Sequence, residues 1–161
     1  MASSKYDVLG IGNAIVDVIA RTEDDFLLQH GLAKGGMMLI DEAAAHRLYD
    51  SMGAATVISG GSAANTIVGL ASFGIRTAFV GKLHDDEAGR SFAHDIRKSG
   101  VHFETAFAKD GASTARCLVL VTPDGERTMN TYLGACQQLG PDDIDEAIVR
   151  NSSILYLEGY L

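Results

Sequence analysis

Short runs of apolar and β-branched residues alternate along the chain with longer amphipathic stretches. The first pattern predicts strands and the second predicts helices. The predicted strands span residues 6–11, 15–19, 35–40, 56–59, 77–81, 101–108, 114–121, 127–133 and 154–161. The predicted helices span residues 24–30, 42–51, 63–73, 84–100 and 141–150. This alternation predicts an α/β fold with a mostly parallel sheet and helices on both of its faces.

Turn and capping residues support several of these boundaries. Asp41 is a plausible N-cap for the second helix, and Gly74 is expected to end the third. The sequence TPDGE at residues 122–126 predicts a hairpin turn between two apolar strands.

Two segments do not fit a plain doubly wound sheet. Residues 15–40 and 114–133 are rich in predicted strands and lack crossover helices. We expect them to pair into a small sheet, a lid that covers one edge of the larger sheet. The last predicted strand is apolar and nothing follows it to cover its other side. We therefore expect residues 1–161 to be the N-terminal part of a longer, truncated α/β domain.

Composition narrows the class of protein. Hydrophobic residues make up 47% of the 161 residues, which indicates a packed core. The net charge of −8, with no basic run longer than two residues, argues against a nucleic-acid partner. The two cysteines lack metal-ligand or disulfide spacing, so we expect free thiols and no metal site. No signal peptide or membrane span is apparent, so we expect a soluble, cytoplasmic protein.

The stretch GIGNAIVD, residues 10–17, raises the question of a phosphate-binding loop. A dinucleotide fingerprint needs a third small residue where a helix packs on the strand, but Ile15 stands there within a β-branched run. No GxxxxGK[ST] sequence exists in the chain. A strand is therefore favoured over a helix after the glycines, which argues against a dinucleotide site.

Asp17 is the more informative residue of that stretch. A carboxylate among four β-branched neighbours is costly to bury without hydrogen-bond donors. Two adjacent hydroxyls of a polyol could supply such donors. The alternative is that Asp17 pairs with a buried arginine or with backbone amides.

A second cluster occurs in the sequence SGGSAAN at residues 59–65. The glycine pair before a predicted helix allows close approach of a ligand and exposes amide N–H groups at the positive helix end. Asn65 lies on the first turn, where its amide can donate to and accept from a hydroxyl. The alternative is a tight turn in which Ser62 is the N-cap.

These motifs resemble those of the PfkB carbohydrate kinase family, over essentially all 161 residues. GIGNAIVD is similar to the family's first strand and sugar-binding aspartate, and GGSAANTIVGLASFGIRTAFVGKLHDDEAG is similar to its N-terminal signature. The signature is broken at Ile67, where a small residue is usual, and at His84, where a glycine is usual. Asn13, Ser62 and the MML sequence at 37–39 most resemble the adenosine kinase branch of the family.

The resemblance implies a ribokinase-like fold and a set of substrate contacts. Asp17 would hold the ribose 2′- and 3′-hydroxyls, with Asn13 near the nucleoside. The other implied substrate contacts are Gly60, Gly61, Ser62 and Asn65 at the sugar, and Leu39, Met129 and Thr131 at the base. Arg127 would close over the transferred phosphate; the alternative is a solvated hairpin residue.

The resemblance also implies the reaction. With Mg²⁺, a phosphoryl group would pass from ATP to the hydroxymethyl group of a nucleoside. The nucleoside implied is adenosine, and the product would be AMP. The family's catalytic aspartate belongs to a C-terminal DTxGAGD segment that this sequence lacks, so we expect it beyond Leu161 and expect the chain alone to be inactive. Three alternatives stay open: a ribose or fructose kinase, an NAD-dependent oxidoreductase half-domain, and a non-catalytic nucleoside- or sugar-binding module. The oligomeric state, monomer or homodimer, also stays open.

Overall fold

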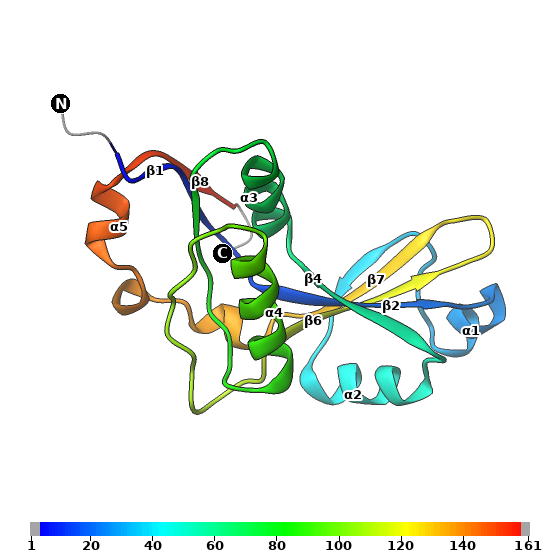
Figure 1. Ribbon diagram of the computed structural model, residues 1–161. Helices are drawn as coiled ribbons and strands as arrows, with labels where there is room; N and C mark the ends of the chain where they lie inside the picture. Colours follow the sequence, from blue (N-terminus) through cyan, green and yellow to red (C-terminus); the bar gives the residue numbers. More distant parts are fainter. Residues whose placement is uncertain (1–3, 159–161) are drawn as a thin grey trace.

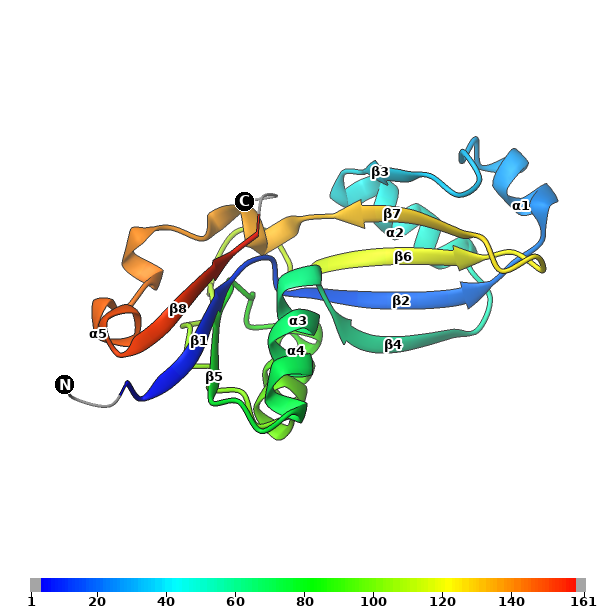
Figure 2. The ribbon, with the colours of Figure 1, turned by 90° about the horizontal axis from the view of Figure 1, so that it is seen from above.

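Residues 4–158, the part of the chain that the computed structural model describes, form two β-sheets joined at a narrow junction (Figures 1 and 2). The first sheet has three parallel strands in the order β5-β1-β8. Its strands are β1 (Tyr6–Ile11), β5 (Thr77–Val80) and β8 (Ser152–Leu157). Parallel strands joined by helices were expected from the alternating pattern.

The second sheet has five strands in the order β3-β7-β6-β2-β4. These are β2 (Ile15–Arg21), β3 (Met37–Leu39), β4 (Ala55–Gly60), β6 (Ala115–Val121) and β7 (Arg127–Tyr132). The β2–β6 and β3–β7 pairs are parallel, whereas β2–β4 and β6–β7 are antiparallel. Segments nearly 100 residues apart thus share one sheet, and β4 joins them at its edge.

Helices cover both faces of the first sheet, in agreement with the predicted α/β fold. On one face, α3 (Ser62–Ser72) and α4 (Glu87–Lys98) bury an apolar core with Ile67, Phe79 and Phe92 at its centre. On the other face, α5 (Glu146–Arg150) and two 3₁₀ turns pack against Leu9 and Val80. In residues 4–158 no helix is both long and apolar enough to cross a bilayer.

The second sheet is covered by helices on only one face. The helices α1 (Asp24–Gln29) and α2 (Glu42–Ser51) pack on it from below in the view of Figure 1. Their contacts are with Val18, Leu118 and Leu120, alternate residues of neighbouring strands that form a separate small core. Because side chains alternate along a strand, the residues between them point to the opposite face.

Two predicted elements differ from the observed ones. Residues 101–108 make only two isolated bridges rather than a strand. Between the two bridges, the Phe103 carbonyl accepts from the Arg97 guanidinium at 2.9 Å rather than from a neighbouring strand. The predicted helix at 141–150 is divided into a 3₁₀ turn and α5. The Asp143 carboxylate binds the Gly140 N–H and the Lys82 ammonium, and Asp145 caps the second part.

Asp86 joins the first sheet's helices to the second sheet. Its carboxylate caps α4 by accepting from the Gly89 N–H at 2.8 Å, and it accepts from the Thr114 N–H at 2.9 Å, just before β6 begins. Burial opposes its ionisation, but these backbone donors prevail and lower the pKa of Asp86. Gly89 is required here, because a Cβ would lie 2.8 Å from the Thr114 hydroxyl oxygen.

We predict that Asp86→Ala lowers the free energy of unfolding by about 2–4 kcal/mol. The change removes a helix cap and leaves the fully buried Thr114 N–H without a partner. Asp41→Ala is the matched control, because Asp41 caps α2 through the Ala44 N–H and makes no second bond, so about 1 kcal/mol is expected. Urea unfolding measures both, and equal losses would contradict the joining role.

The Asp86 contribution should also depend on pH. Because the folded pKa is lowered, the stabilisation is complete above the unfolded value of about 3.9 and is lost as pH falls through the folded pKa. The difference between wild type and Asp86→Ala should therefore shrink below about pH 4.

Candidate functional site

The glycines of GIGNAIVD lie where the chain passes from the first sheet to the second. β1 ends at Ile11 and β2 begins at Ile15, with no helix between them, so the strand prediction is confirmed. A Cβ on Gly12 would lie 2.5 Å from the Ala63 Cβ, and one on Gly10 would lie 2.8 Å from the Ile67 Cδ1. These glycines therefore let α3 pack closely on β1, which is a role in packing rather than in phosphate binding.

Asp17 lies on the face of the second sheet that α1 and α2 leave open. It alternates with Val16 and Val18, which are buried in the cores on the opposite face. No residue within 4–158 forms a hydrogen bond or ion pair with its carboxylate. Burial alone raises the pKa of Asp17, as expected for a carboxylate that no donor compensates. The alternative of a buried arginine or amide partner is not what the described residues show.

Gly60 and Gly61 bring the end of β4 against Asp17 and Asn13. A Cβ on Gly60 would lie 2.8 Å from Asp17 Oδ1 and closer still to Oδ2. Gly61 has a φ of +94°, and a Cβ there would collide with the Asn13 carbonyl oxygen. The fold therefore requires glycine at position 61, whereas glycine at position 60 leaves room for the Asp17 carboxylate. Four of the predicted site residues meet at this corner.

The first turn of α3 adds two polar side chains. Ser62 is exposed and is the first residue of the helix, so it does not cap it; the N-cap is Gly61. Asn65 is exposed, and its side-chain amide has no partner among residues 4–158. With Ser59, Gly60 and residues of α4 it lines a hollow of about 200 Å³. An unpartnered carboxylate on the open face of the second sheet and an unpartnered amide on the α4 side thus lie on opposite sides of Gly60.

The strand register places several predicted site residues in one row across the open face of the second sheet. Asp17 pairs with Cys117, Cys117 with Thr131 and Thr131 with Leu39, so one row crosses four strands. The next row contains Met129 beside Met37. Cys117 and Thr131 are nearly buried, whereas Leu39 is 63% exposed and Met37 is 55% exposed. The face is therefore polar at Asp17 and has an accessible apolar wall at β3 and β7.

Arg127 lies at the distal end of the same face. It opens β7 and is exposed, four residues before Thr131. At about 3.3 Å per residue, this spacing separates it from the Thr131 row by roughly 13 Å. The open sheet therefore does not bring Arg127 to the corner formed by Asp17 and Gly60.

Two residues near the site were not predicted from the sequence. Cys117 lies between Asp17 and Thr131; the Thr131 hydroxyl donates to its sulfur at 3.3 Å, and burial raises the pKa of the thiol. The Glu158 carboxylate accepts from the Asn13 N–H at 3.3 Å. The alternation of β6 could have placed Cys117 on this face, but only the strand register puts it beside Asp17.

Asn13 connects this corner with a larger hollow. It is 6% exposed and, with residues of the 3₁₀ turns and the ends of β1 and β8, lines a cavity of about 560 Å³. The cavity walls are mostly apolar, including Leu133, Leu139 and Leu157.

The arrangement suits binding more than bond making. Asp17 can accept two hydrogen bonds, Asn65 can donate or accept, and the neighbouring apolar wall can cover a flat, weakly polar group. Cys117 and Cys136 are buried, with raised pKa values, and are poor nucleophiles. Within residues 4–158 no cluster of three or more His, Cys, Asp or Glu side chains could hold a metal ion.

Two solved structures share this fold closely. Adenosine kinase from Sinorhizobium meliloti superposes with a TM-score of 0.92 at 54% identity, over 98% of this chain and 48% of that chain. A probable sugar kinase protein from Rhizobium etli CFN 42 gives a TM-score of 0.92 at 47% identity, with the same two coverages. The chain therefore spans about half the length of these relatives.

Sequence comparison agrees. Probable fructokinase-3 of Arabidopsis thaliana is 35% identical over 99 residues, which are 60% of this chain and 29% of that protein. The pfkB family carbohydrate kinase pattern matches residues 37–161, well over half of the chain. The resemblance drawn from the two glycine motifs is thus confirmed: the protein belongs to the pfkB family of carbohydrate kinases and has the ribokinase-like α/β fold.

Proposed function

We propose that the protein contributes the substrate side of a nucleoside kinase, which transfers a phosphoryl group from ATP to the hydroxymethyl group of adenosine and forms AMP. One observation carries the proposal: an uncompensated carboxylate at a glycine corner lies in the same strand row as an exposed apolar wall. A ribose with an attached purine matches both features, because its adjacent hydroxyls can donate to the carboxylate and its flat ring can lie on the apolar wall.

The ribose part of the proposal rests on Asp17 and its neighbours. The two carboxylate oxygens would accept hydrogen bonds from the 2′- and 3′-hydroxyls, which removes the cost of leaving Asp17 half-buried without donors. The backbone at Gly60 and Gly61 lies at this corner and would bind the remaining hydroxyl atoms. The Asn65 amide, which lines the hollow on the α4 side of Gly60, would reach the sugar from there. Asn13 and Ser62 would contact the nucleoside from either side of this corner.

The base part of the proposal rests on the apolar wall. Leu39, Met129 and Thr131 would flank the purine, and the flexible thioether of Met129 suits an adaptable contact. A relative named as an adenosine kinase is 54% identical, which supports the nucleoside. Relatives named as a sugar kinase and a fructokinase support the second candidate, a kinase of ribose or fructose.

The second sheet would act as a lid in this proposal. It extends from the junction on its own and presents its open face beside the sugar corner (Figure 2). Closure over the nucleoside would exclude water from the transfer step. It would also carry Arg127 from the distal end of the sheet toward the phosphate.

ATP and Mg²⁺ are the expected co-reactants, but residues 4–158 do not fit them. No acidic cluster suitable for Mg²⁺ occurs in this part of the chain, and the sequence has no glycine-lysine phosphate loop. We expect the general base and the ATP site outside these residues. The role of this chain is to bind and orient the nucleoside.

We predict that Asp17→Asn weakens adenosine binding while it stabilises the fold. Loss of charge-assisted hydrogen bonds of about 1.5–3 kcal/mol should raise Kd by about 10- to 100-fold. Because burial raises the folded pKa of Asp17, its ionised form costs stability, and this cost disappears as pH falls through that pKa. Tm should therefore rise at pH 7 and approach the wild-type value at low pH. Unchanged adenosine Kd would show that Asp17 does not hold the ribose.

We predict that Gly60→Ala displaces the Asp17 carboxylate and abolishes measurable adenosine binding. The new methyl group would overlap the carboxylate, so the Asp17 side chain must leave its position at the corner. Gly53→Ala is the matched control, because a Cβ there meets no atom within 4 Å. Calorimetric titration of both variants, with circular dichroism to verify folding, tests this. Normal binding by a folded Gly60→Ala protein would contradict the geometry.

Substrate choice is tested by ADP release from the full-length protein with Mg-ATP and adenosine, inosine, ribose or fructose in separate reactions. We expect turnover with adenosine and little with either free sugar. If only ribose or fructose were turned over, the sugar kinase would be favoured, and the apolar wall would have no role in binding a base. Leu39→Ser should lower kcat/KM for adenosine by several-fold through lost apolar contact, and should leave a sugar substrate unaffected.

A further inference from the structure

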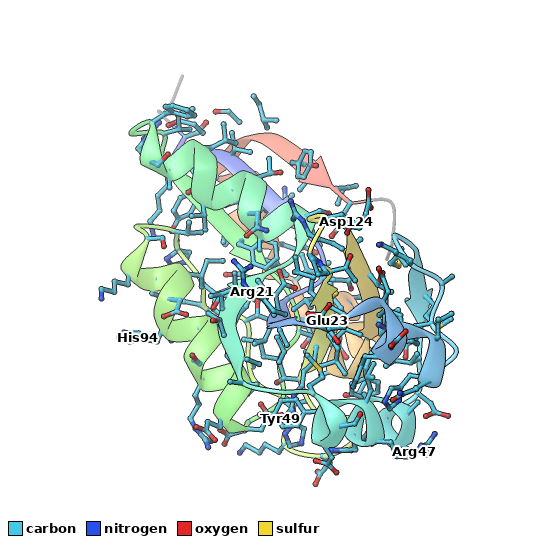
Figure 3. All side chains as sticks on the ribbon, turned by 90° about the vertical axis from the view of Figure 1, so that its right-hand side faces the viewer. Arg21, Glu23, Arg47, Tyr49, His94 and Asp124 are labelled. Atoms are coloured by element: carbon cyan, nitrogen blue, oxygen red, sulfur yellow. The ribbon has the colours of Figure 1, made fainter. Side chains whose placement is uncertain are left out.

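A cavity of about 400 Å³ lies behind the second sheet, on the face opposite Asp17. One wall consists of Val16 and Val18 of β2, Val57 of β4 and Tyr49 of α2. The other wall is the first part of α4, with Glu87, Ala88 and Ser91. Figure 3, viewed from the distal end of the second sheet, shows Tyr49 of α2 on the side that faces α4.

Arg116 projects into this cavity from β6 without a partner. It follows Ala115 and precedes Cys117, so it lies on the face opposite the Asp17 row. It is only half-exposed, yet it forms no hydrogen bond or ion pair with any residue of 4–158. A half-buried guanidinium beside apolar residues is expected to gain from a carboxylate.

Glu87 is the carboxylate on the opposite wall. It lies in the first turn of α4, is exposed, and has no ion-pair partner among the described residues. Arg116 belongs to the second sheet, whereas Glu87 belongs to the helix layer of the first sheet. The hydrogen bond between Thr114 and Asp86 lies beside both residues and would act as the pivot, so the angle between the two sheets changes the distance between Arg116 and Glu87 around that contact.

Four chain segments cross the junction and would set that angle. They are residues 12–14, 60–61, 113–114 and 133–134, and the glycines at 61 and 134 have φ values of +94° and +46°. Because Asp17 and Arg116 are on opposite faces, closure toward the Asp17 face moves the back of the sheet away from α4. Movement in the other direction narrows the cavity and brings Arg116 toward Glu87.

We propose that Arg116 and Glu87 form an ion pair when the second sheet swings back against α4, and that this pair is a latch that holds the lid open. The latch rests on the proposed function in one respect, which is that lid closure accompanies nucleoside binding. Binding must then break the pair, so the latch sets part of the cost of closure.

Glu42 provides an internal control for the latch. It lies near Arg116 in a small hollow behind the same sheet, and its carboxylate accepts from the Ser113 hydroxyl at 2.8 Å. Because Glu42 is on α2, which packs on the second sheet itself, it moves with Arg116. A pair between Glu42 and Arg116 would not respond to the angle between the sheets.

The latch is tested without any ligand by disulfide formation across the cavity. Val57 and Ser91 are exposed residues on the two walls, and each is replaced by cysteine in the full-length protein. The rate at which the two cysteines form a disulfide is then measured. Arg116→Ala or Glu87→Ala should each slow cross-linking by about two- to fivefold, as expected for loss of one partly exposed pair. The double change should add little, and the swap Arg116→Glu with Glu87→Arg should restore the rate.

Two further measurements make the outcome decisive. Glu42→Ala should leave cross-linking unchanged, and 1 M NaCl should reduce the wild-type rate toward that of the single variants. Equal rates in wild type, Arg116→Ala and Glu87→Ala would overturn the latch, as would independent, additive effects of the two changes. Circular dichroism of each variant excludes loss of folding as the cause of a slower rate.

Adenosine titration connects the latch to function. In proteins without the added cysteines, Arg116→Ala and Glu87→Ala should each tighten adenosine binding by about two- to fivefold, because closure no longer breaks a pair. Arg90→Ala is the matched control, since Arg90 lies on α4 but pairs with Asp85 away from this cavity. If adenosine binds to none of the proteins while the cross-linking differences persist, the proposed function fails and the latch stands.

Discussion

The rest of the structure depends on how tightly α3 packs against the turn between β1 and β2. The chain leaves the first sheet at Ile11 and enters the second at Ile15, and the helix crosses directly over this three-residue passage. Only glycine at positions 10 and 12 allows that approach, because any Cβ would overlap Ile67 or Ala63. The same contact places the start of α3 and its glycine pair beside Asp17. One packing constraint therefore creates both the junction between the sheets and the corner of the candidate site.

The residues at the corner around Asp17 and Gly60 lower the stability of the fold. A carboxylate half-buried without donors, a glycine pressed against it and an exposed apolar wall each cost folding free energy, and none is compensated within the described residues. Two other charged sites are compensated: Asp86 accepts from two backbone N–H groups, and Lys82 pairs with Asp143. Local violations of otherwise consistent packing are typical of functional sites. The contrast between Asp17 and Asp86, two aspartates of one chain, is therefore informative about function.

Much of the fold could be predicted from the sequence because its signals are local. Strand and helix runs, the cap at Asp41 and the turn at 122–126 depend on residues close in the chain. The composition of the open face could not be predicted in the same way. The row from Asp17 through Cys117 and Thr131 to Leu39 depends on the register between segments about 100 residues apart, and local alternation does not set that register. The Asp86–Thr114 contact and the irregular path of residues 101–108 are likewise tertiary effects.

Alternation along β6 assigns different tasks to adjacent residues. Cys117 faces the Asp17 row, and Arg116, its neighbour, faces the cavity in front of α4. Cys117 and Arg116 are fixed to one rigid strand. Any movement of the sheet that brings Cys117 closer to a substrate must therefore take Arg116 away from α4. The two faces of the sheet thus respond to the same movement in opposite ways, and no long pathway of side chains between them is needed, because successive residues of a strand point to opposite faces. The angle between the sheets is then the single variable through which a charge behind the lid could alter binding in front of it.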